Sequence, residues 1–88
     1  MDYRDRLLGL AETYRAARGL SLARVSTLVR NDGKFFDSMR AKKNGKRRSC
    51  TVETYETAIS WFDDEWPEDL EWPSQYVERP SAQKVEAA

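Results

Sequence analysis

The chain has 88 residues, enough for one domain with a modest core. Its composition, 40% hydrophobic and 34% charged residues, is typical of a folded soluble protein. No apolar run approaches the roughly 18–20 residues that span a bilayer, the first ten residues do not resemble a secretory signal, and the lone Cys50 excludes an internal disulfide. These features predict a cytoplasmic protein.

The net charge of zero hides a strong asymmetry between the two halves of the chain. Residues 1–48 contain thirteen Lys or Arg and five Asp or Glu, a net charge of +8, whereas residues 49–88 contain two basic and ten acidic residues, a net charge of −8. Either two solvated surfaces of opposite charge attract each other within the domain, or the basic half faces a polyanion. We favour the second interpretation because the bases cluster where a nucleic-acid-binding motif needs them.

Apolar residues at helical spacing predict a first helix over residues 2–18, which Gly19 ends. Ser21 can cap a short second helix, because its hydroxyl can accept a hydrogen bond from a free N–H of the first turn. The apolar side of this second helix consists of Leu22, Val25, Leu28 and Val29. The composition of residues 30–33, Arg-Asn-Asp-Gly, then predicts a turn.

A third helix is predicted over about residues 33–42, with Asp32 as its cap and with Phe36 and Met39, three positions apart, as its buried pair. Phe35 lies outside this buried pair and has two possible roles. The stronger alternative is that it completes the core or covers the first helix; the other is that it faces outward. Residues 42–48 hold five basic residues around an Asn-Gly turn and predict an exposed loop.

A further helix is predicted over residues 52–65, with Thr51 as its cap, and Trp66-Pro67 ends it because the residue before proline avoids helical geometry. Residues 67–80 are expected to form an extended acidic and aromatic segment, packed on the domain or at a dimer interface, and residues 81–88 a disordered tail. The predicted fold class is all-α: a compact bundle of four to five helices, with a helix-turn-helix within residues 1–66.

Several residues at matching positions make residues 7–62 resemble the lambda-repressor/Cro-like (XRE-type) helix-turn-helix family. The matches are Leu20-Ser21 at the start of the second helix, the buried Val25 beside Ser26, the inward-facing Phe36 and Met39, the basic run Gly45-Lys46-Arg47-Arg48, and Thr51-Val52 at the next helix start. The chain departs from the family pattern at Leu22, Arg30 and Asn31, and about three extra residues precede the basic run.

The resemblance implies a sequence-specific transcriptional regulator, such as a repressor, that binds double-stranded DNA as a homodimer. Its recognition helix, about residues 33–42, would enter the major groove. The interpretation as a DNA-binding regulator depends on that helix projecting from the surface of the fold near Lys34. The candidate base-reading residues are Lys34, Phe35, Asp37 and Ser38, with Ala41 as a further possibility. The candidate phosphate contacts are Ser21, Arg24, Thr27, Arg40, Lys42, Lys43, Lys46, Arg47 and Arg48.

The aromatic segment near the end of the chain leaves two alternatives open. Trp61, Trp66, Trp72 and Tyr76 are candidates for the dimer interface, but the same side chains can equally close the core of the monomer. An alternative function is a protein-interaction module, antitoxin-like or a phage-type adaptor, that uses residues 61–76. An enzyme is not expected, since the chain has no histidine, no paired cysteines and no glycine-rich phosphate loop. We likewise expect no metal, cofactor, small-molecule ligand or membrane partner.

Overall fold

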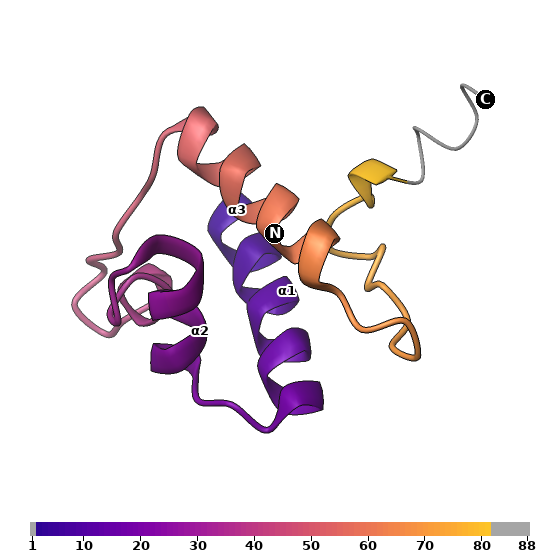
Figure 1. Ribbon diagram of the computed structural model, residues 1–88. Coiled ribbons are helices and arrows are strands. Elements are labelled where there is room, and N and C mark those ends of the chain that lie inside the picture. Colours follow the sequence, from indigo (N-terminus) through magenta and orange to yellow (C-terminus); the bar gives the residue numbers. More distant parts are fainter. Residues whose placement is uncertain (1, 82–88) are drawn as a thin grey trace.

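The computed structural model describes residues 2–81, and within this range the chain is helical and has no strands (Figure 1). These residues form three complete α-helices, α1 (Tyr3–Arg18), α2 (Leu22–Arg30) and α3 (Val52–Glu65), and one 3₁₀ turn, η1 (Asp37–Met39). The prediction of an all-α fold is confirmed. The expected number of four to five helices is not confirmed among residues 2–81, because the predicted helix over residues 33–42 does not form.

Short polar caps define the ends of the three helices. The Asp2 and Asp5 carboxylates form a capping box at the start of α1, and Gly19 ends this helix with a left-handed φ of 68°. The Ser21 hydroxyl accepts a hydrogen bond from the Arg24 N–H at 3.0 Å at the start of α2. The Thr51 hydroxyl accepts one from the Thr54 N–H at 3.1 Å at the start of α3, so both predicted caps are confirmed.

The segment after α2, residues 33–40, consists of turns and a 3₁₀ turn and contains no α-helix; we call it the coil. In an α-helix over residues 33–42, the Phe36 N–H would donate to the Asp32 carbonyl four residues earlier. It donates instead to the Ser26 hydroxyl on α2, at 3.1 Å. Residues 33–36 therefore form turns, η1 follows, and Arg40 is already extended with a ψ of 146°. The prediction of a recognition helix over residues 33–42 is wrong.

The coil nevertheless supplies a large part of the core. Phe36 and Met39 are fully buried, as predicted, and the Phe36 ring lies 5.9 Å from the ring of Phe62 on α3. Phe35 is also buried, at 1% exposure, and its ring packs edge to face on that of Phe36. Phe35 therefore completes the core, and its assignment as a base-reading residue is wrong.

The segment after α3 folds back onto the helices (Figure 1). The Trp66 indole N–H donates to the Leu70 carbonyl at 2.9 Å, and the Trp72 indole N–H donates to the Val77 carbonyl at 2.7 Å. Both indoles are buried against the core, with 6% and 7% exposure, and their ring centres lie 4.8 Å apart. This part of the chain closes the core of a single molecule.

An ion pair also ties residues near the end of the described chain to α3. The Arg79 guanidinium donates to the largely buried Asp63 carboxylate at 2.6 Å, and Ser81 donates to the same oxygen at 2.8 Å. The tail predicted to be disordered, residues 81–88, lies outside the described residues except for Ser81. Across the described part of the chain, no helix is both long and apolar enough to traverse a bilayer.

Candidate nucleic-acid interface

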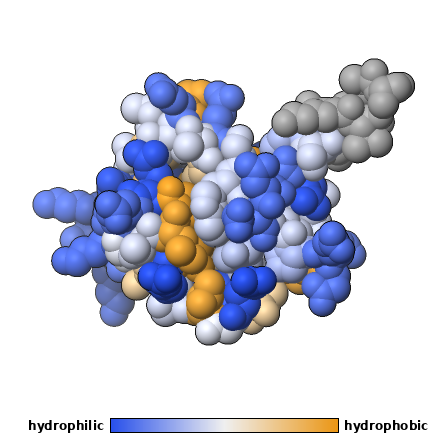
Figure 2. Space-filling model, viewed as in Figure 1, coloured by the Kyte–Doolittle hydropathy of each residue, from blue (hydrophilic) through white to orange (hydrophobic). Residues whose placement is uncertain are grey.

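A group of exposed basic side chains lies on α2, the coil and the loop that leads to α3. In Figure 2, strongly hydrophilic side chains project from the left of the molecule, where Figure 1 shows the chain between α2 and α3. Six basic residues of this region are exposed and have no carboxylate within 4.0 Å among residues 2–81. They are Arg24, Arg30, Lys34, Lys42, Lys43 and Lys46, and we call them the cationic surface.

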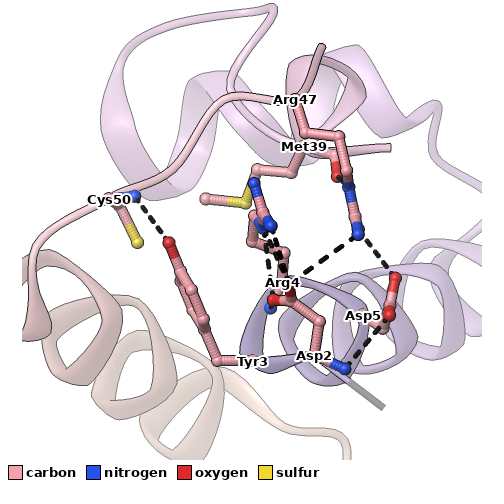
Figure 3. A network of polar contacts seen from close by, with 7 residues as sticks. All are labelled: Asp2, Tyr3, Arg4, Asp5, Met39, Arg47 and Cys50. Atoms are coloured by element: carbon pink, nitrogen blue, oxygen red, sulfur yellow. Dashed lines mark hydrogen bonds and ion pairs between the residues drawn. The ribbon is translucent and has the colours of Figure 1, made fainter. Parts of the chain in front are cut away.

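Arg47 contributes to the fold rather than to this surface (Figure 3). Its Nε donates to the Met39 carbonyl at 2.8 Å, and its Nη2 donates to the Asp5 carboxylate at 2.7 Å. A second carboxylate oxygen, from Asp2, lies 3.9 Å from Nη1. The side chain is only 15% exposed, so Arg47 joins the basic loop to the first turn of α1 and has little surface for a phosphate.

Two more of the arginines predicted to bind phosphate, Arg40 and Arg48, are exposed but also paired. The Arg48 guanidinium lies 2.6 Å from the Asp32 carboxylate and 5.1 Å from the centre of the Phe35 ring. Arg40 pairs with Glu12 on α1 and lies 3.7 Å from Asp37. Either arginine can contact a phosphate only if it shares or exchanges its carboxylate partner.

In the basic half of the chain, the acidic residues pair with arginines and not with lysines. Each of the five acidic residues in residues 2–48 is paired with an arginine: Asp2 with Arg4, Asp5 with Arg47, Glu12 with Arg15 and Arg40, Asp32 with Arg48, and Asp37 with Arg40. No lysine of the described chain takes part in such a pair. A planar guanidinium holds a carboxylate in fixed geometry better than an ammonium does. Arginines such as Arg40 and Arg47 therefore connect separate elements, whereas the lysines within residues 2–81 have no carboxylate partner.

The ion pairs also change the acidity of the carboxyl groups. The hydrogen bond from Arg47 is the main reason that the pKa of Asp5 lies below its ordinary value. The hydrogen bond from Arg48 does the same for the pKa of Asp32. Both carboxylates therefore keep their negative charge, and their hold on the two arginines, well below neutral pH.

The predicted base-reading residues differ in how far their side chains are exposed. Lys34 and Asp37 are exposed on the coil, whereas Ser38 is half-buried and its hydroxyl donates to the Phe35 carbonyl at 2.9 Å. The Asp32 carboxylate accepts a hydrogen bond from the Lys34 N–H at 3.0 Å and so fixes the backbone from which the lysine projects. Lys34 and Asp37 therefore offer exposed polar ends on the coil, of which only Lys34 is without an ion-pair partner within residues 2–81, since the Asp37 carboxylate lies 3.7 Å from Arg40.

The two hydroxyl residues predicted to contact phosphates have local partners. Ser21 is exposed and caps α2, and the Thr27 hydroxyl donates to the Ala23 carbonyl at 3.1 Å. Arg30 was not among the predicted contacts, because the composition of residues 30–33 indicates a turn, whereas Arg30 lies in the exposed last turn of α2. Glu12 and Asp5 were not predicted either, since their arginine partners lie 28 and 42 positions away along the chain.

Comparison with known proteins provides no relative of this chain: no family model, no curated protein and no solved structure matches it.

Proposed function

We propose that the chain binds double-stranded DNA through the cationic surface and acts as a regulator. The recognition helix near Lys34, on which the expectation of sequence-specific binding depended, does not form, so base reading would have to come from the coil. The observation that carries this proposal is the set of six exposed bases without a carboxylate partner, gathered on α2, the coil and the following loop. Contacts of this kind to phosphates supply most of the salt-dependent affinity of DNA-binding proteins. Arginines already engaged with carboxylates would supply less.

The second part of the proposal concerns base reading. Since the coil is not an α-helix, α2 and the coil would act as a shortened helix-turn-helix in which residues 33–39 replace the recognition helix. Lys34 can donate to guanine and Asp37 can accept from a cytosine amino group, so the coil offers one donor and one acceptor at neighbouring positions. Two such residues read few bases, and a homodimer on a two-fold site would double their number.

The alternative of a protein-interaction module that uses residues 61–76 has less support. Such a module needs exposed aromatic anchors, and the indoles of Trp66 and Trp72 are buried in the core of the single chain. Trp61 and Tyr76 are half-buried and keep part of their surface. The acidic side chains of the segment would remain as its main feature, without a hydrophobic centre.

The proposal is tested by the salt dependence of duplex binding. We define the lysine loop as Lys42, Lys43 and Lys46, and change all three residues to glutamine. If each lysine contacts one phosphate, the slope of log affinity against log salt becomes less steep by about 2–3. Fluorescence anisotropy with a labelled duplex from a random pool, measured at several salt concentrations, gives this slope.

A control must separate local contacts from net charge. A matched variant lowers the net charge by the same three units through glutamate at three exposed positions of the acidic half: Thr57, Ser60 and Gln75. Its salt slope should stay close to that of the wild type, because these positions lie on α3 and beyond it. Equal losses in both variants, or no duplex binding by the wild type, would refute the proposal.

A further inference from the structure

A shallow apolar groove lies where the loop from the cationic surface meets the start of α3. It has a volume of about 420 Å³ and is lined by Tyr3, Cys50, Thr51, Val52 and Tyr55. The Tyr3 and Tyr55 rings meet edge to face, 5.8 Å apart, and the Tyr3 hydroxyl accepts a hydrogen bond from the Cys50 N–H at 3.2 Å (Figure 3). The groove is therefore a firmly built surface at the junction of α1 and α3.

An exposed apolar side chain stands at the edge of this groove. Val52 is 73% exposed, and the only other large hydrophobic side chain exposed in the described part of the chain is Leu28, at 39%. Figure 2 shows a hydrophobic spot between hydrophilic atoms at the top of the molecule, over the first turn of α3. The same patch thus carries both an apolar projection and an apolar recess.

Charges of both signs surround the patch. Arg6 is exposed and lies three residues after Tyr3, on the same side of α1. Burial raises the pKa of Tyr55, and the positive charge of Arg6 opposes that rise. Glu53 and Glu56 are exposed on the first turns of α3, and none of these three charged groups has an ion-pair partner among residues 2–81.

We propose that this patch is the contact surface between two copies of the chain, in which Val52 of each copy enters the groove of the other. A two-fold contact pairs a surface with itself, so each projection needs a recess and each charge needs its opposite on the same patch. Val52 against the tyrosine-lined groove meets the first requirement. Arg6 against Glu53 or Glu56 of the other copy meets the second for one of the two carboxylates. A peptide or small ligand would need only the recess.

This inference does not depend on DNA binding. The proposed dimer surface is formed by α1 and α3 and not by the tryptophan-rich segment, whose Trp66 and Trp72 are buried. The patch is small in comparison with the roughly 800 Å² per partner of a standard interface. The dimer is therefore weak in the absence of a ligand that holds two copies together.

The test is sedimentation equilibrium of the full chain without nucleic acid, at concentrations from about 10 µM to about 1 mM. Wild-type protein should self-associate to a dimer, and Val52→Glu should weaken that association by at least about tenfold. Leu28→Glu is the matched control, because it places the same charge on the other exposed hydrophobic residue, on α2. It should leave the dimer unchanged.

A second readout needs no variant. Cys50 lines the groove, so the rate at which iodoacetamide alkylates its thiol should fall as the protein concentration passes through the dimerisation range. A wild-type protein that stays monomeric at about 1 mM would overturn the proposal. Equal weakening by Val52→Glu and Leu28→Glu, or a Cys50 alkylation rate independent of concentration, would do the same.

Discussion

Arg47 and Asp5 lie 42 positions apart in the chain, and their side chains meet at 2.7 Å. The pair fixes the basic loop on the first turn of α1, and the same guanidinium donates to the Met39 carbonyl at the end of the coil. One side chain thus connects three parts of the fold. A residue that sequence patterns assign to phosphate binding holds the domain together instead.

Replacement of Arg47 by alanine is expected to destabilise the domain. The loss of the charged hydrogen bond to the Met39 carbonyl alone should cost about 1–2 kcal/mol. For a domain of this size that corresponds to a fall in melting temperature of roughly 5–15 °C. Thermal unfolding followed by circular dichroism measures the change.

The control for this variant is Lys43→Ala, which removes an exposed base from the same loop. Its melting temperature should stay within a few degrees of the wild type, because exposed surface changes are usually worth less than about 0.5 kcal/mol. If both alanine variants melt at the wild-type temperature, Arg47 is not the structural link described above.

Stability should depend on pH through the carboxylates that the arginines hold. The folded-state pKa of Asp32 lies below its ordinary value of 3.8, mainly because Arg48 donates a hydrogen bond to it. A lowered pKa in the folded state stabilises the fold above the unfolded-state pKa, and this stabilisation is lost as the pH falls through the folded value. The melting temperature should therefore fall between about pH 5 and pH 2.

Asp32→Asn isolates the contribution of this pair. Asparagine can still accept the Lys34 N–H, so the variant changes mainly the charge. It should melt below the wild type at pH 7, and the two melting curves should converge near pH 2 as the wild-type carboxyl becomes protonated. A constant difference between pH 7 and pH 2 would rule out the Arg48 pair as its cause.

The helices were predictable because their signals are local. Ser21 and Thr51 each cap the helix that begins at the next residue, and Gly19 ends α1 by adopting a left-handed conformation that few other residues tolerate. The absence of a helix over residues 33–42 was not predictable in this way. It depends on the hydrogen bond between Ser26 and the Phe36 N–H, ten positions apart, and a pattern of apolar residues does not encode such a bond.

The candidate interface was predictable in position but not in detail. The run of bases in residues 40–48 identifies the region, because charge clustering is visible in any sequence. Whether a given base is free depends on carboxylates that approach from α1, such as Glu12 beside Arg40. Only the folded chain brings these groups together, so sequence analysis assigned the paired arginines and the free lysines to the same role.

Ser26→Ala tests the explanation for the coil. Ser26 is fully buried, accepts the Phe36 N–H and donates to the Leu22 carbonyl at 2.9 Å. Alanine fits the space but leaves a buried N–H without an acceptor, which should cost about 1–3 kcal/mol. Urea unfolding should show this loss, whereas Thr27→Ala, which removes a half-buried hydroxyl from the next position, should cost less. Equal costs would mean that the Ser26 hydrogen bond does not hold the coil.

Gly9 and Tyr76 make a close contact that constrains the C-terminal segment. A Cβ atom on Gly9 would lie 2.7 Å from the Tyr76 ring, too close for the ring to remain in place. Gly9→Ala should therefore destabilise the wild type by about 1–3 kcal/mol through overpacking. In a Tyr76→Ala background the same change should stabilise the chain by up to about 1 kcal/mol, since alanine favours a helix interior. Thermal melts of the four proteins test this reversal of sign, and a Gly9→Ala effect of the same sign in both backgrounds would contradict the close approach of the ring.

The final prediction separates base reading from phosphate binding. Lys34→Ala and Asp37→Ala should change which duplexes are selected from a random pool, by about 1–3 kcal/mol for each base that the side chain reads. Glutamine at the three positions of the lysine loop should weaken all duplexes about equally, because phosphates carry no sequence information. The two kinds of variant are expected to differ because Lys34 and Asp37 lie on a coil fixed by Asp32 and by the buried Phe36, whereas the three lysines lie on an exposed loop. If the selected sequences are the same for all variants, the coil does not read bases, and the cationic surface binds duplex DNA without sequence preference.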